Sequence, residues 1–518
     1  MARERWGSRF GVVMAVAGSA IGLGNLLRFP GMAAKNGGGA FMIPYFVALL
    51  LLGLPLTWIE WTIGRFGGGF GHSTAPGMFH TLWNKNRFIK YFGVIGIFGP
   101  IVIFVYYTYI ESWLLGYSYF ALTGQYGACT GPEEMSAFLN GYRGVASNAY
   151  FSGIGTAYLF FAVTFLLNIV IVYFGIRRGI EKVCIVSLPL LFLVGIVLVV
   201  RVLTLGTPDP AHPDWNVTSG LGFLWNPDWS ALASGKVWLA AAGQIFFTLS
   251  VGIGVILTYA SYLTDRDDVA LSGLSAASAN ELVEVILGGT LVIPAAFAFF
   301  GPEETMKVAG SVFDLAFVTM PLVLQKLAYG HVFGFLWFLL LFVAGLTSSI
   351  SLVQPAIAFL EDEFGLSRRS AILAFSAVTF AMTQACIFGL ARGVVDEFDF
   401  WGGNFCLVLF GTVEAILFAW VFGVEEAWTQ LHVGSDITIP RIYRFIIKYV
   451  TPPFLLVILG TWFCQEGLQT ILMRNVAKGD FWYVFGTRAM LLALFVGLAI
   501  LVKILWRRRR RQAEGLAP

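Results

Sequence analysis

The sequence predicts an all-α membrane protein with twelve transmembrane helices. Only 12% of its 518 residues are charged, whereas soluble globular proteins carry roughly 25%. With 58% hydrophobic residues and a mean hydropathy of +0.77, the chain lacks the charged shell that keeps a soluble protein of this size dispersed. Its apolar residues form stretches of about 20 residues or more, the length that crosses a bilayer as a helix. Soluble enzymes and nucleic-acid-binding proteins are thereby excluded.

Twelve such stretches follow one another along the chain. They cover residues 10–33, 39–65, 89–122, 152–174, 181–205, 237–263, 271–300, 331–360, 370–391, 397–423, 445–470 and 481–506. The largest segments between them, 123–151, 206–236 and 301–330, all fall on one side of the membrane, and no soluble domain fits among the spans. Each span is expected to be helical because a helix satisfies its own backbone hydrogen bonds in lipid.

The orientation follows from the basic residues. Most of the 33 Lys and Arg residues lie on the side that holds Arg5, Arg9 and the run Arg507 to Arg511, and the cytoplasmic side is the one rich in Lys and Arg. The net charge of +3 does not indicate a nucleic-acid partner. The first residues contain no signal-peptide cleavage site, so the first span is expected to be retained. We expect a multi-pass protein with both termini cytoplasmic.

Spans 1 and 6 are unusual because each contains two closely spaced glycines. Span 1 has AIGLG at 20–24, and span 6 has SVGIG at 250–254. Each glycine destabilises a helix by about 1 kcal/mol, so both helices are expected to be broken in mid-membrane. The alternative is close helix packing, for which small residues are also suited. Because spans 1–5 and 6–10 run in opposite directions, paired breaks favour an inverted repeat with a binding site at the midplane.

A broken helix offers free N–H groups at one half-helix end and free carbonyls at the other. This pair of charges suits a zwitterion, with its carboxylate near Leu23 and Gly24. Neutral oxygens lie beside the breaks or in mid-span, and such oxygens suit an alkali cation that must be released again. They belong to Asn25, Thr248, Ser250, Asn280, Thr347, Ser348 and Ser349. The alternative for any one of them is a hydrogen bond across helices or to its own backbone.

Ionisable residues within spans are functional candidates by default. They are Arg28, Glu60, Glu111, Glu281, Glu284 and Glu414. Glu60, Glu111 and Glu414 are expected to be structural, because an unwound segment needs acceptors for its free N–H groups. The five histidines lie in loops or at span ends and the five cysteines show no metal-ligand spacing, so no enzymatic centre is predicted.

Five motifs carry a family resemblance. They are GSAIGLGN at 18–25, LRFP at 27–30, NGGGAF at 36–41, GQIFFTLS at 243–250 and GLTSS at 345–349. In these strings, and in span order over essentially its whole length, the chain resembles the neurotransmitter:sodium symporter family, and most closely its bacterial leucine-transporter members. The resemblance implies a sodium-coupled amino-acid symporter with the leucine-transporter (LeuT) type of fold. In that fold, spans 1–5 (1–236) and 6–10 (237–424) are inverted repeats, followed by spans 11 and 12 with a basic tail (425–518).

The resemblance also implies two Na⁺ ions as co-substrates, with no other cofactor. The first sodium site would comprise the Ala20 carbonyl, Asn25, Thr248, Asn280 and the substrate carboxylate. The second would comprise the carbonyls of Gly18, Ile21 and Ala344 with the hydroxyls of Thr347 and Ser348. The implied substrate contacts are Ser19, Ala20, Leu23, Gly24, Ile103, Tyr107, Phe247, Thr248, Ser250, Ile253, Ser348 and Leu352. Arg28 with Asp399 matches the family's outer gate, and Arg3 with Asp362 its inner gate, with Trp6 and Tyr262 nearby.

The chain departs from its leucine-transporting relatives in the pocket. It has Ser19 for Asn, Ile103 for Val, Ile253 for Phe and Leu352 for Ile, so we expect a medium to large hydrophobic amino acid as substrate. Chloride-dependent members have a serine at the position of Glu284. This resident carboxylate predicts chloride independence, and a proton carried by Glu284 on the return step is an open possibility.

The predicted function is therefore sodium-coupled symport of hydrophobic, aliphatic or aromatic, amino acids by alternating access. The alternatives are an amino-acid receptor or sensor without net transport, and a channel, which two gates bracketing the site disfavour. The expected partners are the amino acid, Na⁺ and membrane lipid, with H⁺ counter-transport and a homodimer left open. The short second external loop and lone Cys129 resemble prokaryotic members, which favours a bacterial inner membrane.

Overall fold

The computed structural model describes residues 4–513 and is helical throughout this range, apart from loops and one isolated bridge between Gly38 and Pro227. Spans 1 to 5 contain α1 (Arg9–Ala20), η1 (Gly24–Arg28) and α2 (Phe29–Lys35); α3 (Met42–Ala48), η3 (Leu49–Gly53) and α4 (Leu54–Gly69); α6 (Ile89–Phe92) and α7 (Ile95–Thr123); α9 (Gly155–Tyr173); and η4 (Ile176–Ile180) with α10 (Glu181–Leu203). The connecting helices are α5 (Ala75–Leu82), α8 (Pro132–Tyr142) and α11 (Val217–Trp225).

The second half repeats this sequence of spans. Spans 6 to 10 contain α12 (Gly235–Thr248) and α13 (Val255–Ala260); α14 (Val269–Glu281), η6 (Leu282–Gly288) and α15 (Gly289–Val308); α18 (Gly330–Ala358) with η8 (Phe359–Glu363); α19 (Arg368–Phe388); and α20 (Val394–Phe398), η10 (Asp399–Phe405), α21 (Cys406–Ile416) and η11 (Leu417–Gly423). The remaining helices are α16 (Val312–Asp314) and α17 (Met320–Gln325); α22 (Val424–His432), α23 (Ile442–Phe445), η12 (Ile446–Val450), α24 (Thr451–Trp462), η13 (Phe463–Gly467) and α25 (Leu468–Ile471); and α26 (Phe481–Ala513), which is span 12.

The helices have the length and composition of membrane spans. Within residues 4–513, ten are long and apolar enough to cross a bilayer, and α1 with η1 and α2 forms an eleventh span bent by 49°. The predicted sixth span is present as α12, of 14 residues, and α13, of 6 residues, with a non-helical break between them. The predicted all-α fold with broken helices in spans 1 and 6 is confirmed.

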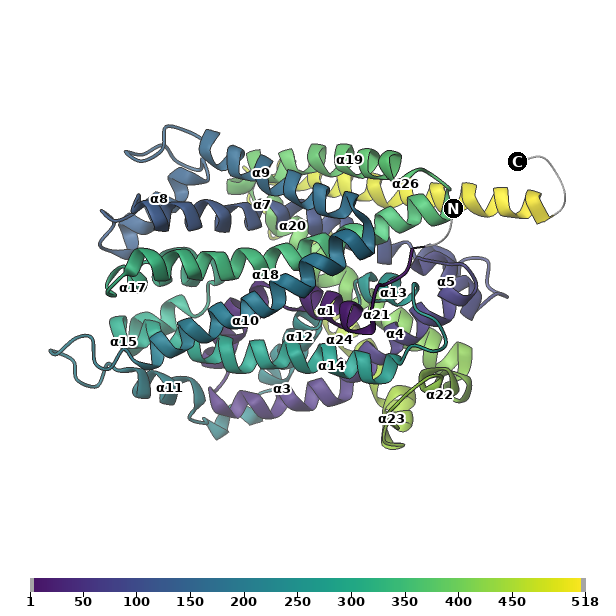
Figure 1. Cartoon of the computed structure of the whole chain (residues 1–518), viewed down its shortest axis with the longest axis horizontal. Helices are drawn as coiled ribbons and strands as arrows, with labels where there is room; N and C mark the ends of the chain where they lie inside the picture. The colour runs from purple at the N-terminus through teal and green to yellow at the C-terminus, as the bar shows by residue number, and fades with distance from the viewer. Residues whose placement is uncertain (1–3, 514–518) are drawn as a thin grey trace.

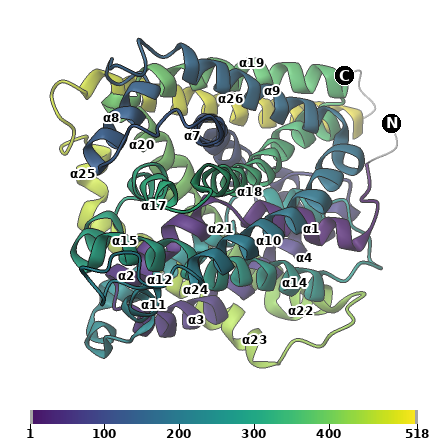
Figure 2. The same ribbon diagram turned by 60° about the vertical axis from the view of Figure 1, so that its left-hand side comes forward.

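Two long helices occupy the middle of the molecule. Figures 1 and 2 show α18 beside α7, and these two helices pack against each other along much of their length. In both views α9, α19 and α26 lie along one side of this pair. The broken helices α1 and α13 pack against α18, and Figures 1 and 2 show α1 and α12 on the side of α18 away from α9, α19 and α26.

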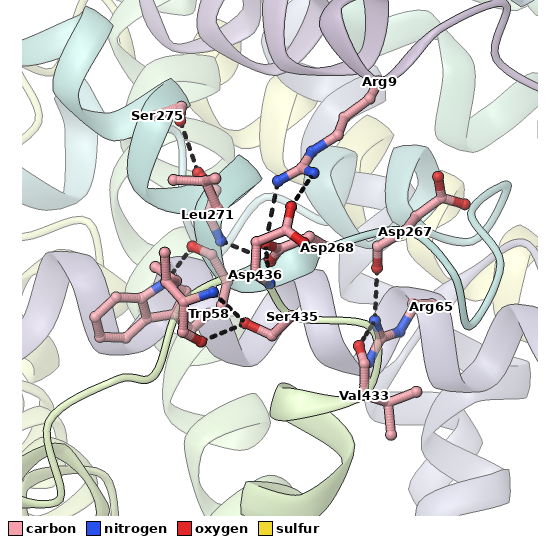
Figure 3. Close-up of polar contacts among 12 residues, drawn as sticks. Arg9, Trp58, Arg65, Asp267, Asp268, Leu271, Ser275, Val433, Ser435 and Asp436 are labelled. Atoms are coloured by element: carbon pink, nitrogen blue, oxygen red, sulfur yellow. Dashed lines mark hydrogen bonds and ion pairs between the residues drawn. The ribbon is translucent and has the colours of Figure 1, made fainter.

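A network of charges ties the start of α1 to two distant loops (Figure 3). The Arg9 guanidinium pairs with Asp268 at 3.1 Å and with Asp436 at 2.6 Å. The Asp268 side chain, 1% exposed, also caps α14 by accepting from the Leu271 amide at 2.8 Å. Beside it, Arg65 donates to the carbonyls of Asp267 and Val433. The network therefore fastens α1 to the segments before α14 and after α22.

This network predicts unequal effects of its two carboxylates on stability. Asp268→Ala should lower the free energy of unfolding by about 2–3 kcal/mol, since it removes a helix cap and the acceptor of two further donors. Asp436→Ala should cost less than about 1 kcal/mol, because an exposed pair contributes little; the Asp436 side chain is 65% exposed. Thermal unfolding of both variants in the same detergent measures the difference. Equal unfolding temperatures for the two would contradict the assignment.

Candidate functional site

The first wall of the site is the break in span 1. α1 ends at Ala20, and the chain resumes helical hydrogen bonding at Gly24. The Asn25 side chain fills the gap by accepting a hydrogen bond from the Gly22 amide through Oδ1 at 2.8 Å. A Cβ on Gly24 would lie 2.5 Å from Cε1 of Phe247. Glycine at this position therefore lets the aromatic ring lie against the broken backbone.

The second wall is the break in span 6, which follows Thr248. Ser250 has a φ of 53° and Gly254 a φ of 92°, values that an L side chain rarely adopts. A Cβ on Gly254 would also meet the Gly96 carbonyl oxygen at 2.5 Å, so the backbone of this break packs directly on α7. Ser250 Oγ donates to the Ser19 carbonyl at 3.1 Å and joins the two breaks. Glu60 accepts a hydrogen bond from the Gly252 amide, as expected for a carboxylate beside an unwound segment.

A buried polar cluster lies behind the two breaks. Asn25 Nδ2 is 3.0 Å from Thr248 Oγ1, 2.8 Å from Asn280 Oδ1 and 3.0 Å from Glu284 Oε2. Asn280 Nδ2 also donates to Thr248 Oγ1 at 3.0 Å, and Gln244 donates to Glu284 at 2.8 Å. Glu284 lies on the π-helical turn η6 and accepts from Thr248 as well. The side chains predicted for the first sodium site are thus brought together, 0–1% exposed, beside one carboxylate.

The residues predicted for the second sodium site lie where α1 meets α18. A Cβ on Gly18 would be 3.2 Å from Cβ of Thr347, so the two helices are in close contact here. Thr347 Oγ1 donates to the Ala344 carbonyl at 3.1 Å. Ser348 Oγ donates to the Ser19 carbonyl at 3.1 Å, the same acceptor that Ser250 uses. Neutral oxygens of both helices therefore face one another, which is the donor set that suits Na⁺.

One cavity, with a volume of about 50 Å³, lies between the breaks. Its walls contain every residue that was predicted to contact the substrate, together with Gly22, Asn25, Tyr106, Gly403 and Leu407. Sequence reasoning missed Gly22, Gly403 and Leu407 as lining residues, although the glycine pair 402–403 in span 10 was a possible signal. The placement of the lining residues is observed, whereas their binding of an amino acid stays a prediction.

The predicted outer gate is not an ion pair in this structure. The Arg28 guanidinium carbon lies 4.4 Å from the centre of the Phe247 ring, a cation–π contact. Asp399 instead accepts from Tyr106 Oη at 2.6 Å and Asn404 Nδ2 at 2.9 Å. Among residues 4–511 no ion pair joins Arg28 to Asp399, because each has found another partner. The gate role of the two residues stays a prediction, and both lie near the cavity wall formed by Phe247 and Tyr106.

At the opposite end, Arg3 of the predicted inner gate lies outside the described residues. Asp362 accepts from Ser73 Oγ at 2.5 Å and from Tyr262 Oη at 3.0 Å. Trp6 Nε1 donates to the Tyr259 carbonyl at 3.0 Å. The remaining members of this gate therefore join the segment before α1, the C-terminal end of α13 and η8.

Comparisons with known proteins identify relatives of this architecture. A model of the sodium:neurotransmitter symporter family matches residues 3–507. The chain is 30% identical to an uncharacterized sodium-dependent transporter of Methanocaldococcus jannaschii over 87% of this chain and 89% of the relative. It is 25% identical to the sodium-dependent nutrient amino acid transporter 1 of Drosophila ananassae, over 88% and 78% of the two chains. The crystal structure of MhsT in complex with L-phenylalanine is similar, with a TM-score of 0.75 and 29% identity, covering 88% of this chain and 99% of MhsT.

Proposed function

Because the chain belongs to the sodium:neurotransmitter symporter family, we propose that it couples the uptake of hydrophobic amino acids to the movement of Na⁺. The observation that carries this proposal is the cavity enclosed by two helix breaks, with the cluster of Asn25, Thr248 and Asn280 beside it. Half-helix ends suit the carboxylate and amine of an amino acid, and neutral oxygens suit Na⁺. The substrate class is supported by two related proteins, the nutrient amino acid transporter 1 of Drosophila ananassae and MhsT in complex with L-phenylalanine.

Coupling would arise at the first sodium site, where the ion would contact both the protein and the substrate carboxylate. Neither would bind well alone, and this mutual dependence links their movements. A ~10-fold Na⁺ gradient supplies about 1.4 kcal/mol per ion, and a potential of ~100 mV adds about 2.3 kcal/mol per charge. Two ions would supply about 7 kcal/mol, which supports roughly 10⁵-fold accumulation at full coupling. We further propose chloride independence and cytoplasmic termini in a prokaryotic plasma membrane.

Uptake into proteoliposomes tests the proposal. The purified chain should accumulate labelled hydrophobic amino acids when Na⁺ is higher outside, and not with equal Na⁺ on both sides. Binding without accumulation would favour a receptor or sensor, and downhill flux independent of a Na⁺ gradient would favour a channel. Either result would overturn the proposal. The same assay over a panel of amino acids identifies the preferred substrate.

The size of the pocket gives a prediction about selectivity. Ile253 lines the cavity where the leucine-transporting relatives have phenylalanine. Ile253→Phe adds a ring to the pocket and should reduce the uptake of aromatic relative to small aliphatic amino acids by about 10- to 200-fold, the range for small changes in an apolar pocket. Competition of phenylalanine and alanine for labelled leucine measures this ratio. Ile256→Phe, in α13 just after the break and outside the cavity lining, is the control. An unchanged ratio in Ile253→Phe would place the side-chain pocket elsewhere.

A further inference from the structure

A second, entirely separate hollow lies on the far side of α7 and α18 from the substrate cavity. It is a groove of about 460 Å³ between α7, α18 with η8, α19 and α26. Ile97 and Phe359 form its buried floor, at 0% and 1% exposed, whereas Val378 on its rim is 46% exposed. All four walls belong to helices that qualify as membrane spans. The groove therefore opens toward the lipid phase.

Small residues keep this groove open. Ala374 on α19 and Ala493 and Gly497 on α26 line it, and a Cβ built on Gly497 would meet no atom within 4 Å. Small residues in membrane helices normally allow close helix contact, but here they face empty space. The two flanking helices leave room between them for something that is not part of the chain.

The lining selects an apolar occupant. Among the lining residues, Thr379 carries the one polar side chain group, and its hydroxyl already donates to the Phe375 carbonyl at 2.8 Å. Thr379 is also 0% exposed, so the surface of the groove offers a ligand no accessible polar side chain, which disfavours any polar solute. The lining from Leu501 to Ala493 on α26 extends about 12 Å at 1.5 Å per residue. This length lies within one leaflet, whose hydrocarbon layer is about 15 Å thick.

The positively charged side chain of Arg508 lies near one end of the groove. The ring of Phe359, on the floor, contacts the ring of Phe364 at 5.3 Å between centres. The Arg508 guanidinium carbon lies 5.9 Å from the centre of the Phe364 ring. Its neighbour Arg509 pairs with Glu363, but Arg508 forms no ion pair among the described side chains. An exposed, uncompensated charge directly beyond an apolar groove suits the phosphate of a membrane lipid.

We propose that this groove binds one anionic phospholipid, with an acyl chain between α19 and α26 and its phosphate at Arg508. The site would also act on transport, because its back wall is shared with the substrate cavity. Ile101 faces the groove and Ile103 the cavity on α7, and Ala356 lies one turn from the cavity residue Leu352 on α18. A bound chain supports both helices from behind, so its loss gives them space to move.

The test counts lipids on the purified full-length chain. Native mass spectrometry after purification from membranes that contain phosphatidylglycerol should detect one more retained phospholipid on the wild type than on Gly497→Phe, whose ring fills the groove. Gly486→Phe is the matched control, because Gly486 is on the same helix, exposed, and also has no atom near its Cβ position. This control should retain the lipid. Arg508→Gln should still bind a phospholipid but lose the preference for phosphatidylglycerol over phosphatidylcholine in exchange experiments.

Three results would overturn the proposal. Gly497→Phe and Gly486→Phe must first show the unfolding temperature of the wild type. If Gly497→Phe then retains as much lipid as the wild type, the groove holds no lipid. A dimer that disappears in Gly497→Phe and not in Gly486→Phe would identify a second copy of the chain as the occupant. Retention of phosphatidylglycerol and phosphatidylcholine in the ratio of the surrounding membrane, unchanged by Arg508→Gln, would contradict the headgroup site. The counting does not depend on transport, so it can succeed or fail apart from the proposed function.

Discussion

Asn25→Ala is expected to abolish sodium-dependent uptake, with substrate binding weakened at least about 100-fold at a fixed Na⁺ concentration. Asn25 holds the polar cluster together through its contacts with Thr248, Asn280 and Glu284, and it also accepts from the Gly22 amide in the break. The alanine variant loses a proposed sodium ligand and leaves several buried groups unpaired. Each such group costs about 1–3 kcal/mol, and 1.4 kcal/mol corresponds to a tenfold change in affinity.

Equilibrium binding of a labelled amino acid at increasing Na⁺ concentrations measures this effect. In Asn25→Ala the Na⁺ concentration for half-saturation should rise far above that of the wild type. Asn36→Ala serves as the control, since Asn36 follows the end of α2 in the same span and bonds only to the Met32 carbonyl through its side chain. If Asn25→Ala kept the sodium dependence of the wild type, the first sodium site would not lie in this cluster.

The positions of the helix breaks were predictable from sequence because glycine pairs at 20–24 and 250–254 interrupt otherwise apolar spans. The family resemblance, and not the glycine pattern, placed Thr248 and Asn280 in one site, since Asn280 lies in the middle of span 7. A helix break is a local feature of the sequence. The cost of unpaired backbone groups in a membrane leaves few alternative structures for the segment that contains it. The residues around the cavity could be named in advance for this reason together with the family resemblance.

Partner choice among long side chains could not be predicted. Arg28 was expected to pair with Asp399, but it stacks on Phe247, and Asp399 bonds to Tyr106. Arg28 and Asp399 could pair with each other, or they could contact Phe247 and Tyr106 as observed. Both arrangements satisfy the two charged groups, so the choice between them depends on the positions of whole helices. The Arg9 contact with Asp436 was equally hidden, because the two residues are 427 positions apart.

The lipid-facing groove was invisible in the sequence for another reason. Ala374 and Gly497 are apolar residues in apolar spans, and this pattern is the same whether a residue faces lipid, a helix or a groove. Only the placement of α19 beside α26 reveals that the small residues leave a space. Periodicity therefore predicts which segments enter the membrane, and the packing of the spans decides what lies between them.

Glu284→Ser is expected to convert the protein into a chloride-dependent transporter. Glu284 is fully buried and accepts hydrogen bonds from Asn25, Gln244 and Thr248. The serine leaves these buried donors without their acceptor, at a cost of about 1–3 kcal/mol for each donor, so uptake in chloride-free buffer should fall roughly 10²- to 10³-fold. Chloride beside the new hydroxyl would restore the missing negative charge. Uptake with gluconate replaced stepwise by chloride measures the rescue, and the wild type should not respond to the same exchange.

Glu281→Ser is the control, because it removes a neighbouring carboxylate and keeps Glu284. Glu281 lies three residues earlier, at the end of α14, and accepts a hydrogen bond from Tyr45 at 2.7 Å. Uptake by Glu281→Ser should stay independent of chloride.

The proposed role of Glu284 as a proton carrier gives a further prediction. A carboxyl that is protonated on the empty return step exports one H⁺ per cycle. A pH gradient that is acidic inside should therefore accelerate uptake by the wild type and leave uptake by Glu284→Gln unaffected. If wild-type uptake ignores the pH gradient while Glu284→Ser still requires chloride, Glu284 is a permanent negative charge and carries no proton.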